Sequence, residues 1–357
     1  MKRIAVVLAY NPRNAGMFSV DLAASHFFSN LGIPVEFFCA QDPEGFGVKK
    51  YGAMSVNVVK DHTEIFENDI VIYWGDFTTN IQYGVNDFLN WDRIFLGLSP
   101  QLSFDRWRSI FLPSDSYVKS GGVAFSVGQN FQSLRFAEGR IRLDAFRDKY
   151  NNFRGIYPRD ARSLEEIVDF TGREDSVFLG LDPAFLLNKV RFQRAIRPGK
   201  VTMCFGRSGF GNTNLISDFF RKNGFNVVDR SDWLNLRSFN RLSSFYNLLD
   251  DIRSSELVVS DVYHFLVNSI REGIPVIGLG RQQDAQKTTV SDFKKQQLFK
   301  DLGISEFYFS FPEGEIDWSN FLSSFVRGGG TVAHLHSRIA NFEARVAGAI
   351  QEVWEKS

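Results

Sequence analysis

The sequence is short of cysteine, of excess charge and of long apolar runs. Its two cysteines, Cys39 and Cys204, lie far apart and form neither a redox pair nor a zinc-binding motif. Lysine plus arginine total 41, as do aspartate plus glutamate, so no overall field favours nucleic acid or acidic lipid. These absences fit a reducing compartment, and we predict a cytoplasmic protein without a nucleic-acid partner.

No apolar stretch approaches the roughly 20 residues that a membrane-spanning helix requires. The run Ile4–Ala9 follows Lys2 and Arg3, as in a signal peptide, but it stops at Tyr10-Asn11-Pro12. We therefore interpret this run as a buried first strand and predict no membrane insertion.

The sequence does contain short apolar runs that alternate with helical patterns. Its 357 residues exceed the size of a single hydrophobic core, which predicts two domains. Runs typical of parallel strands covered on both faces occur at residues 4–9, 35–39, 69–73, 201–205, 225–229, 257–260 and 274–278. Helical spacing occurs at residues 18–31, 163–170, 213–222, 245–253, 263–271 and 293–302. We predict an α/β fold with two Rossmann-like parallel-sheet domains that face a cleft.

The alternation breaks at Arg197-Pro198-Gly199 and again at Gly328-Gly329-Gly330. We therefore expect one domain over residues 1–190, a second over 191–330, and a final helix within 331–357 that packs back on the first domain. Ligands of open α/β sheets bind at the carboxyl ends of the strands. The functional residues are therefore expected in the loops that follow the strands.

A glycine-rich loop from Gly206 to Gly211 follows one strand and precedes a helix. Helix amino termini carry unsatisfied N–H groups and a partial positive charge, which bind phosphate. We predict that Gly206, Arg207 and Ser208 bind phosphate, with the Arg207 guanidinium as a bidentate donor. The loop has neither the Walker nor the dinucleotide-binding spacing, and an ordinary turn is the alternative.

The segment Ser260-Asp261-Val262-Tyr263-His264 ends a buried strand and opens a helix. His264 is thereby placed at a helix amino terminus, which favours the neutral imidazole that exchanges protons near neutral pH. We predict His264 and Asp261 as catalytic residues. A structural role for a lone histidine is the alternative.

The end of the strand over residues 69–73 carries Trp74-Gly75-Asp76. We predict that Trp74 and Asp76 contact an acceptor sugar, because aromatic rings stack on sugar faces; a strand-end turn is the alternative. His334 and His336 lie two residues apart, on different faces of a helix, so we predict no metal site.

Four segments occur in a defined order in the middle of the chain. The first is the turn Gly128-Gln129 after a strand, and the second joins an Arg-Asp-x-x-Ser motif at 159–163 to an Asp-Pro-Ala-Phe motif at 182–185. The third is a strand, a histidine-bearing helix and a Gly-x-Pro strand over 259–276, and the fourth is a Lys and Leu-Gly pattern over 294–303. In order and spacing these segments resemble the polysaccharide pyruvyl transferase family.

The resemblance implies a two-lobed fold like that of the B-type glycosyltransferases. It also implies an enzyme, without a cofactor, that transfers a pyruvyl group from phosphoenolpyruvate to two hydroxyls of a sugar. By resemblance His264 is an acid or a stabiliser of the departing phosphate. Arg159 and Lys294 would hold the anionic groups of the donor, together with Arg207 of the glycine-rich loop.

The resemblance further implies that the acceptor lies on the N-terminal side and the donor on the C-terminal side. Asn14, in a partial match to an Asn-x-Gly-Asp turn, and Gln129 would join Trp74 and Asp76 as acceptor-binding residues.

The sequence departs from the family at Val262, where an arginine is usual. Valine cannot grip phosphate or carboxylate, so the identity of the donor stays open. A glycosyltransferase of the same two-lobed build with a nucleotide-sugar donor is one alternative. A non-catalytic sugar-binding protein is another.

Overall fold

The computed structural model describes residues 2–41, 49–51, 54–59, 61–131, 143–188, 195–236, 240–282, 290–312 and 329–356. The chain divides into two compact units. Unit 1 comprises Met1–Asn11, Val20–Leu187 and His336–Ser357, and unit 2 comprises Pro12–Ser19 and Asn188–Leu335. The boundary expected at residues 190 and 191 lies outside the described residues.

Unit 1 is built on a seven-stranded sheet in the order β3-β4-β2-β1-β5-β6-β7. Neighbouring strands are parallel, apart from the antiparallel pair of β3 and β4. The strands are β1 (Ile4–Leu8), β2 (Glu36–Cys39), β3 (Lys49–Tyr51), β4 (Met54–Val58), β5 (Ile70–Trp74), β6 (Val123–Val127) and β7 (Phe153–Tyr157). Every residue of β1 is buried, as the apolar run predicts for a strand covered on both faces.

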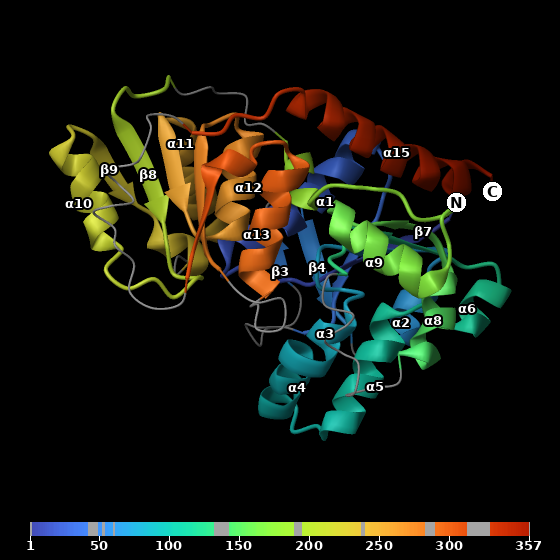
Figure 1. Ribbon diagram of the computed structural model, residues 1–357. Coiled ribbons are helices and arrows are strands. Elements are labelled where there is room, and N and C mark those ends of the chain that lie inside the picture. Colours follow the sequence, from blue (N-terminus) through green and yellow to red (C-terminus); the bar gives the residue numbers. More distant parts are fainter. Residues whose placement is uncertain are drawn as a thin grey trace. The chain divides into compact units, whose positions relative to one another are not determined.

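Helices cover both faces of this sheet (Figure 1). Successive residues of a strand point to opposite faces, and the end of β5 shows the two layers. Tyr73 joins the core cluster beneath α5 and α8, whereas Trp74 packs against Phe27 and Phe28 of α1. The helices that lie wholly or mostly in unit 1 are α1 (Ala15–Leu31), α2 (Thr63–Phe66), α3 (Ile81–Tyr83), the π-helix η1 (Gly84–Phe88), α4 (Leu89–Phe95), α5 (Pro100–Phe111), α6 (Asp115–Lys119), α8 (Asp144–Asn151), α9 (Ala161–Thr171), the 3-10 helix η2 (Pro183–Leu186) and α15 (Leu335–Glu355). The start of α1, up to Ser19, and the first residue of α15 belong to unit 2.

Unit 2 is built on a five-stranded parallel sheet in the order β12-β11-β10-β8-β9. Its strands are β8 (Lys200–Cys204), β9 (Asn226–Asp229), β10 (Leu257–Ser260), β11 (Val276–Arg281) and β12 (Tyr308–Phe311). Its helices are α10 (Asn214–Lys222), η3 (Ser231–Leu234), α11 (Arg241–Arg253), α12 (Tyr263–Arg271), α13 (Val290–Asp301) and η4 (Ser305–Phe307).

These two sheets confirm the predicted α/β class with two parallel-sheet units. Sequence patterns missed β4, β12 and the helices between residues 81 and 119. The helix expected from Ser163 begins at Ala161 instead, because the Asp160 carboxylate accepts a hydrogen bond from the Ser163 amide (2.7 Å) and is the true N-cap. Among the helices of the described residues, none has the length and apolar character needed to span a membrane.

Glycine at position 128 lets two of the motif segments meet. Gly128 follows β6 with a φ of 78°, and a Cβ built there would lie 2.2 Å from Cγ of Pro183. Because Pro183 opens η2, any larger residue at 128 would push this short helix away from the end of β6.

Candidate functional site

A buried ion cluster lies at the carboxyl edge of the sheet in unit 1. Arg159 Nη1 lies 2.6 Å from Asp76 Oδ2 and 3.6 Å from Asp182 Oδ2, and Arg159 Nε lies 3.4 Å from Asp160 Oδ2. We call these four residues the Arg159 cluster. Its guanidinium is fully buried and surrounded by carboxylates, so an incoming anion would have to displace them. This placement departs from the expectation that Arg159 holds an anionic donor.

Gln129 connects the loops that follow β5, β6 and β7. Its Nε2 donates to Thr78 Oγ1 at 2.6 Å, and its Oε1 accepts from the Thr79 amide at 3.3 Å. Its backbone carbonyl accepts from the Arg159 amide at 3.0 Å. Gln129 and Asp76 are both buried, so the structure uses these two predicted acceptor residues to hold loops together.

Trp74 lies in the core of unit 1. Its Nε1 donates to the Val20 carbonyl at 3.1 Å, and its ring centroid lies 5.3 Å from that of Phe27 and 5.9 Å from that of Phe28. A fully buried indole has no ring face left for a sugar. The expected sugar contact therefore does not fit the position of Trp74, because packing against α1 uses the whole ring.

Asp21 is a titratable group at the centre of the sheet that the sequence patterns did not reveal. It lies on α1 and accepts hydrogen bonds from the backbone amides of Tyr10 and Asn11, directly after β1. Among the described residues its Oδ2 has no hydrogen-bond partner. Burial raises the pKa of the Asp21 carboxyl well above its usual value, which favours the protonated form of this group beside the carboxyl end of β1.

The glycine-rich loop of unit 2 is held by one carboxylate. Asp261 Oδ1 accepts from the Gly206 amide at 2.9 Å, while Oδ2 accepts from the amides of Arg207 (3.0 Å) and Ser208 (2.8 Å). Asp261 is completely buried. The loop amides that were expected to bind phosphate therefore bind Asp261, which occupies the position an anion would take.

A buried lysine supports this arrangement from α13. Lys295 Nζ donates to the Asp261 carbonyl and to Ser208 Oγ, each at 2.7 Å, and pairs with Asp292 Oδ1 at 2.6 Å. Burial raises the pKa of Asp261 and lowers the pKa of Lys295, and their mutual attraction opposes both shifts. Lys295 thus belongs to the scaffold, and the neighbouring Lys294 lies with its Nζ 5.0 Å from the ring centroid of Tyr263.

Arg207 is the exposed cation of the loop. Its backbone is fixed by Asp261, whereas its side chain has no partner among the described residues. Arg281, which the sequence patterns missed, braces the same loop by donating to the carbonyls of Ser208 (3.3 Å) and Gly209 (3.2 Å). The loop therefore presents one guanidinium outward on a braced backbone.

His264 packs against the start of α1. A Cβ at Gly16 would lie 2.5 Å from Cβ and 2.9 Å from Nδ1 of His264, so only glycine permits this contact. Asn268 Nδ2 donates to the His264 carbonyl (2.8 Å) and to Ser19 Oγ (3.1 Å), and Ser19 Oγ donates to the Gly16 carbonyl (2.7 Å). The imidazole is thereby placed between the first turns of two helices.

Asn14 shapes the turn that carries Gly16. Its Oδ1 accepts from the amides of Gly16 (3.0 Å) and Met17 (3.3 Å) and so caps α1. Asn14 was expected on the acceptor side together with Gln129, but residues 12–19 cluster with unit 2. Asn14 and His264 therefore belong to unit 2, whereas Asp76, Gln129 and Arg159 belong to unit 1.

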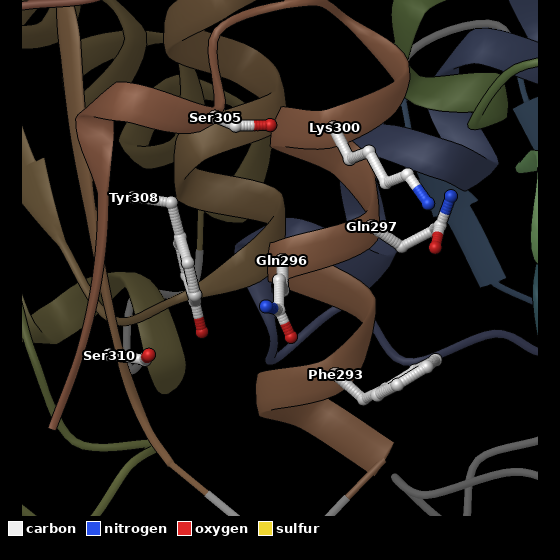
Figure 2. A pocket seen from close by; sticks show the side chains of 7 residues that line it. All are labelled: Phe293, Gln296, Gln297, Lys300, Ser305, Tyr308 and Ser310. Atoms are coloured by element: carbon white, nitrogen blue, oxygen red, sulfur yellow. The ribbon is translucent and has the colours of Figure 1, made fainter.

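The opposite side of α13 forms a pocket of about 300 Å³ with β12. Figure 2 shows the amide of Gln296 and the hydroxyls of Tyr308 and Ser310 turned toward one another, while the ends of Gln297 and Lys300 lie together on the other side of the helix. Gln297 and Lys300 point away from the side of α13 on which Lys295 holds the loop after β8. Among the described residues, no cluster of His, Cys, Asp or Glu could hold a metal ion.

Comparison with known proteins identifies a family. The family model described as polysaccharide pyruvyl transferase matches residues 56–283, more than half of the chain. No curated protein sequence matches the chain at a significant level.

Solved structures match the chain at low sequence identity. An uncharacterized protein of Klebsiella pneumoniae is 14% identical with a TM-score of 0.46, over 87% of this chain and 93% of that one. The UDP-GlcNAc 2-epimerase of Methanocaldococcus jannaschii is 10% identical with a TM-score of 0.49, over 99% and 100% of the two chains. Because these TM-scores are below 0.5, the fold assignment rests on the two sheets described above.

Replacement of Asp21 by asparagine tests whether this carboxyl holds a proton. A carboxyl whose pKa is raised by folding stabilises the fold below its unfolded pKa of about 4, and this contribution is lost as the pH rises toward the folded pKa. Relative to Asp21→Asn, we expect the wild type to lose up to about 1.4 kcal/mol of unfolding free energy per pH unit above pH 4. Urea unfolding across this range measures the difference, and parallel curves for the two proteins would contradict the assignment.

Substitution of Gly16 tests the contact with His264. Because the added methyl of Gly16→Ala overlaps the imidazole, we expect a loss of about 1–3 kcal/mol in unfolding free energy and a shift of the His264 imidazole signals in NMR spectra. Gly348→Ala, on α15, is the matched control, since a Cβ there meets no atom within 4 Å. Unchanged His264 signals in Gly16→Ala would show that the contact is not formed.

Proposed function

This chain belongs to the polysaccharide pyruvyl transferase family, and on that basis we propose that it transfers a pyruvyl group from phosphoenolpyruvate to a sugar of a glycan or glycan precursor. The product is a cyclic ketal. We propose that unit 2 binds the donor, because the exposed cation of the glycine-rich loop and His264 both belong to it.

One observation supports this assignment more than any other. The Asp261 carboxylate binds the amides of the loop that carries Arg207, and Asp261 lies two residues before the start of the helix that carries His264. A cationic group and a proton-transfer group are therefore tied to the same strand–helix junction. That junction is at the carboxyl edge of the sheet, where α/β proteins bind their ligands.

In this proposal the side chains of Arg207 and Lys294 bind the donor. Phosphoenolpyruvate carries a phosphate and a carboxylate, and guanidinium is the side chain best suited to either group. Arg207 contacts one of them, and Lys294, near Tyr263 at the start of α12, contacts the other. These two residues compensate for Val262, whose buried apolar side chain stands where the family has arginine.

The reaction needs one proton at carbon and two new bonds to oxygen. A proton is added to the methylene carbon, which becomes the methyl group, and the first sugar hydroxyl forms a bond to the adjacent carbon. The second hydroxyl then forms a bond to the same carbon as its bond to the phosphate oxygen breaks. Of the two protons released by the sugar hydroxyls, one returns to the group that protonated the carbon, and the other leaves with phosphate. His264 delivers and recovers these protons.

Asp261, Lys295 and Arg281 act as positioning residues in this scheme. They hold the loop backbone and make no contact with the reacting atoms. Arg159, with its guanidinium enclosed by three carboxylates, fixes the loops of unit 1 and takes no part in donor binding.

A glycosyltransferase with a nucleotide-sugar donor is the second candidate function. Val262 favours it, since the family's usual anion-binding arginine is missing at this position. A nucleoside diphosphate would then be the natural ligand of the Arg207 loop.

Loss of the imidazole tests the role in proton transfer. With phosphoenolpyruvate and an acceptor glycan, we expect His264→Ala to release phosphate about a hundredfold more slowly than the wild type. His62→Ala, which removes an exposed imidazole in unit 1, should leave the rate unchanged. Wild-type turnover in a correctly folded His264→Ala protein would remove His264 from the mechanism.

Thermal stabilisation by candidate donors separates the two functions. A ligand present at 100 times its dissociation constant adds about 2.7 kcal/mol to the stability of the folded state. We expect this stabilisation with phosphoenolpyruvate, and we expect Arg207→Ala to abolish it. Arg197→Ala, another exposed arginine of unit 2, is the matched control. Stabilisation by a nucleoside diphosphate alone would instead support the glycosyltransferase.

A further inference from the structure

Unit 1 has a cavity of about 540 Å³ at the edge of its sheet. Its lining residues come from the edge strand β7, from the segment of residues 175–178 and from one face of α15. We call it the β7–α15 pocket. All of its lining residues belong to unit 1, whereas Arg207 and His264 belong to unit 2.

A β-bulge in β7 shapes the floor of the pocket. The pairing of β7 with β6 shifts register there, so that Arg154 is an extra residue between Phe153 and Gly155. Phe153 and Ile156 face the core cluster on the other side of the sheet, which leaves Gly155 and Tyr157 on the pocket side. The Tyr157 ring folds over the bare glycine, since a Cβ at Gly155 would lie 3.1 Å from Tyr157 Cε2.

Small residues on α15 keep the pocket open. Ala344, Gly348 and Ala349 line it at helical spacing, on the same face as Arg345. A Cβ added to Gly348 would meet no atom within 4 Å. The helix therefore leaves a gap above the strand where larger side chains would normally fill the space.

Hydrogen-bond donors without acceptors face this gap. The guanidinium of Arg345 lies 5.8 Å from the ring centroid of Phe178, and among the described residues it has no carboxylate partner. Ser176 is only 6% exposed, yet its hydroxyl has no hydrogen-bond partner within the described part of the chain. A buried hydroxyl without a partner is costly, which points to an acceptor that binds from outside the chain.

The pocket also has two carboxylates, and each lies beside an arginine: Asp175 is 3.9 Å from Arg173, and Glu352 is 3.9 Å from Arg154. Glu352 also pairs with Lys356 at 2.6 Å. Arg173 donates to the backbone carbonyls of Phe153 in β7 and of Asn151, the last residue of α8. Burial raises the pKa of Tyr157 to about 12, so its phenol keeps its proton and can donate at neutral pH.

We propose that the β7–α15 pocket binds the phosphate or carboxylate group of a small molecule, with the Arg345 guanidinium and the Ser176 hydroxyl as its donors. Phosphate and carboxylate share the oxyanion geometry that a guanidinium recognises. Such a ligand would bridge α15 to the bulged edge of the sheet, and its site is separate from the one proposed for the donor in unit 2. The cavity is large enough for a compact metabolite.

Binding of inorganic phosphate and of pyruvate to the full-length protein, measured by isothermal titration calorimetry, tests the proposal and separates the two sources of the oxyanion. The measurement is made on Arg207→Ala protein, so that donor binding in unit 2 does not contribute. We expect Arg345→Gln to weaken binding of the preferred anion at least about tenfold. Gly348→Leu should abolish binding by filling the cavity.

Gly348→Ala is the matched control and should bind as well as its parent, because its methyl enters open space. Circular dichroism melting verifies that each variant is folded, and Ser176→Ala provides a second, milder loss should Gly348→Leu fail to fold. The proposal is overturned if neither anion binds to the Arg207→Ala protein. It is equally overturned if binding persists unchanged in both Arg345→Gln and Ser176→Ala.

Discussion

The carboxylate of Asp261 is the interaction on which unit 2 depends. It accepts hydrogen bonds from three backbone amides of the loop after β8. Lys295 donates to the backbone carbonyl of Asp261 and to the hydroxyl of Ser208. Each amide left without an acceptor would cost about 1–3 kcal/mol, so the loop has one strongly favoured shape. An internal anion thus fills the place that a phosphate fills in other glycine-rich loops, and the Arg207 side chain of this loop is exposed.

In unit 1 a buried cation, and not a buried carboxylate, fixes the loops at the sheet edge. A single buried guanidinium, that of Arg159, gathers the carboxylates of loops that follow β5 and β7 and of the segment at Asp182. Breaking a buried pair leaves an uncompensated charge, which is far more costly than the pair is stabilising. Both units therefore use buried charge to fix loops at a sheet edge.

The apolar runs predicted the strands well, because a strand buried on both faces consists of consecutive apolar residues. Runs such as residues 4–9 and 257–260 became central strands. The site residues stay predictions, because an aspartate or arginine in a loop gives the same signal whether it faces a ligand or another loop. Arg159, Asp261 and Trp74 each proved to have an internal partner that only the folded chain reveals. The bulge at Arg154 and the raised pKa of Asp21 likewise arise from pairing and burial, which local sequence does not encode.

The division of the chain has a consequence for how the molecule is made. Unit 2 includes residues 12–19, and unit 1 includes residues from 336 onward. During synthesis the turn at Gly16 leaves the ribosome long before its partner His264, and unit 1 lacks α15 until residues 335–355 have been made. Domains generally fold as they emerge from the ribosome. Neither unit is one continuous stretch of sequence, so neither can fold completely before parts of the other have been made. Recombination that exchanged residues 188–335 as one segment would therefore transfer His264 without Gly16, the residue against which it packs.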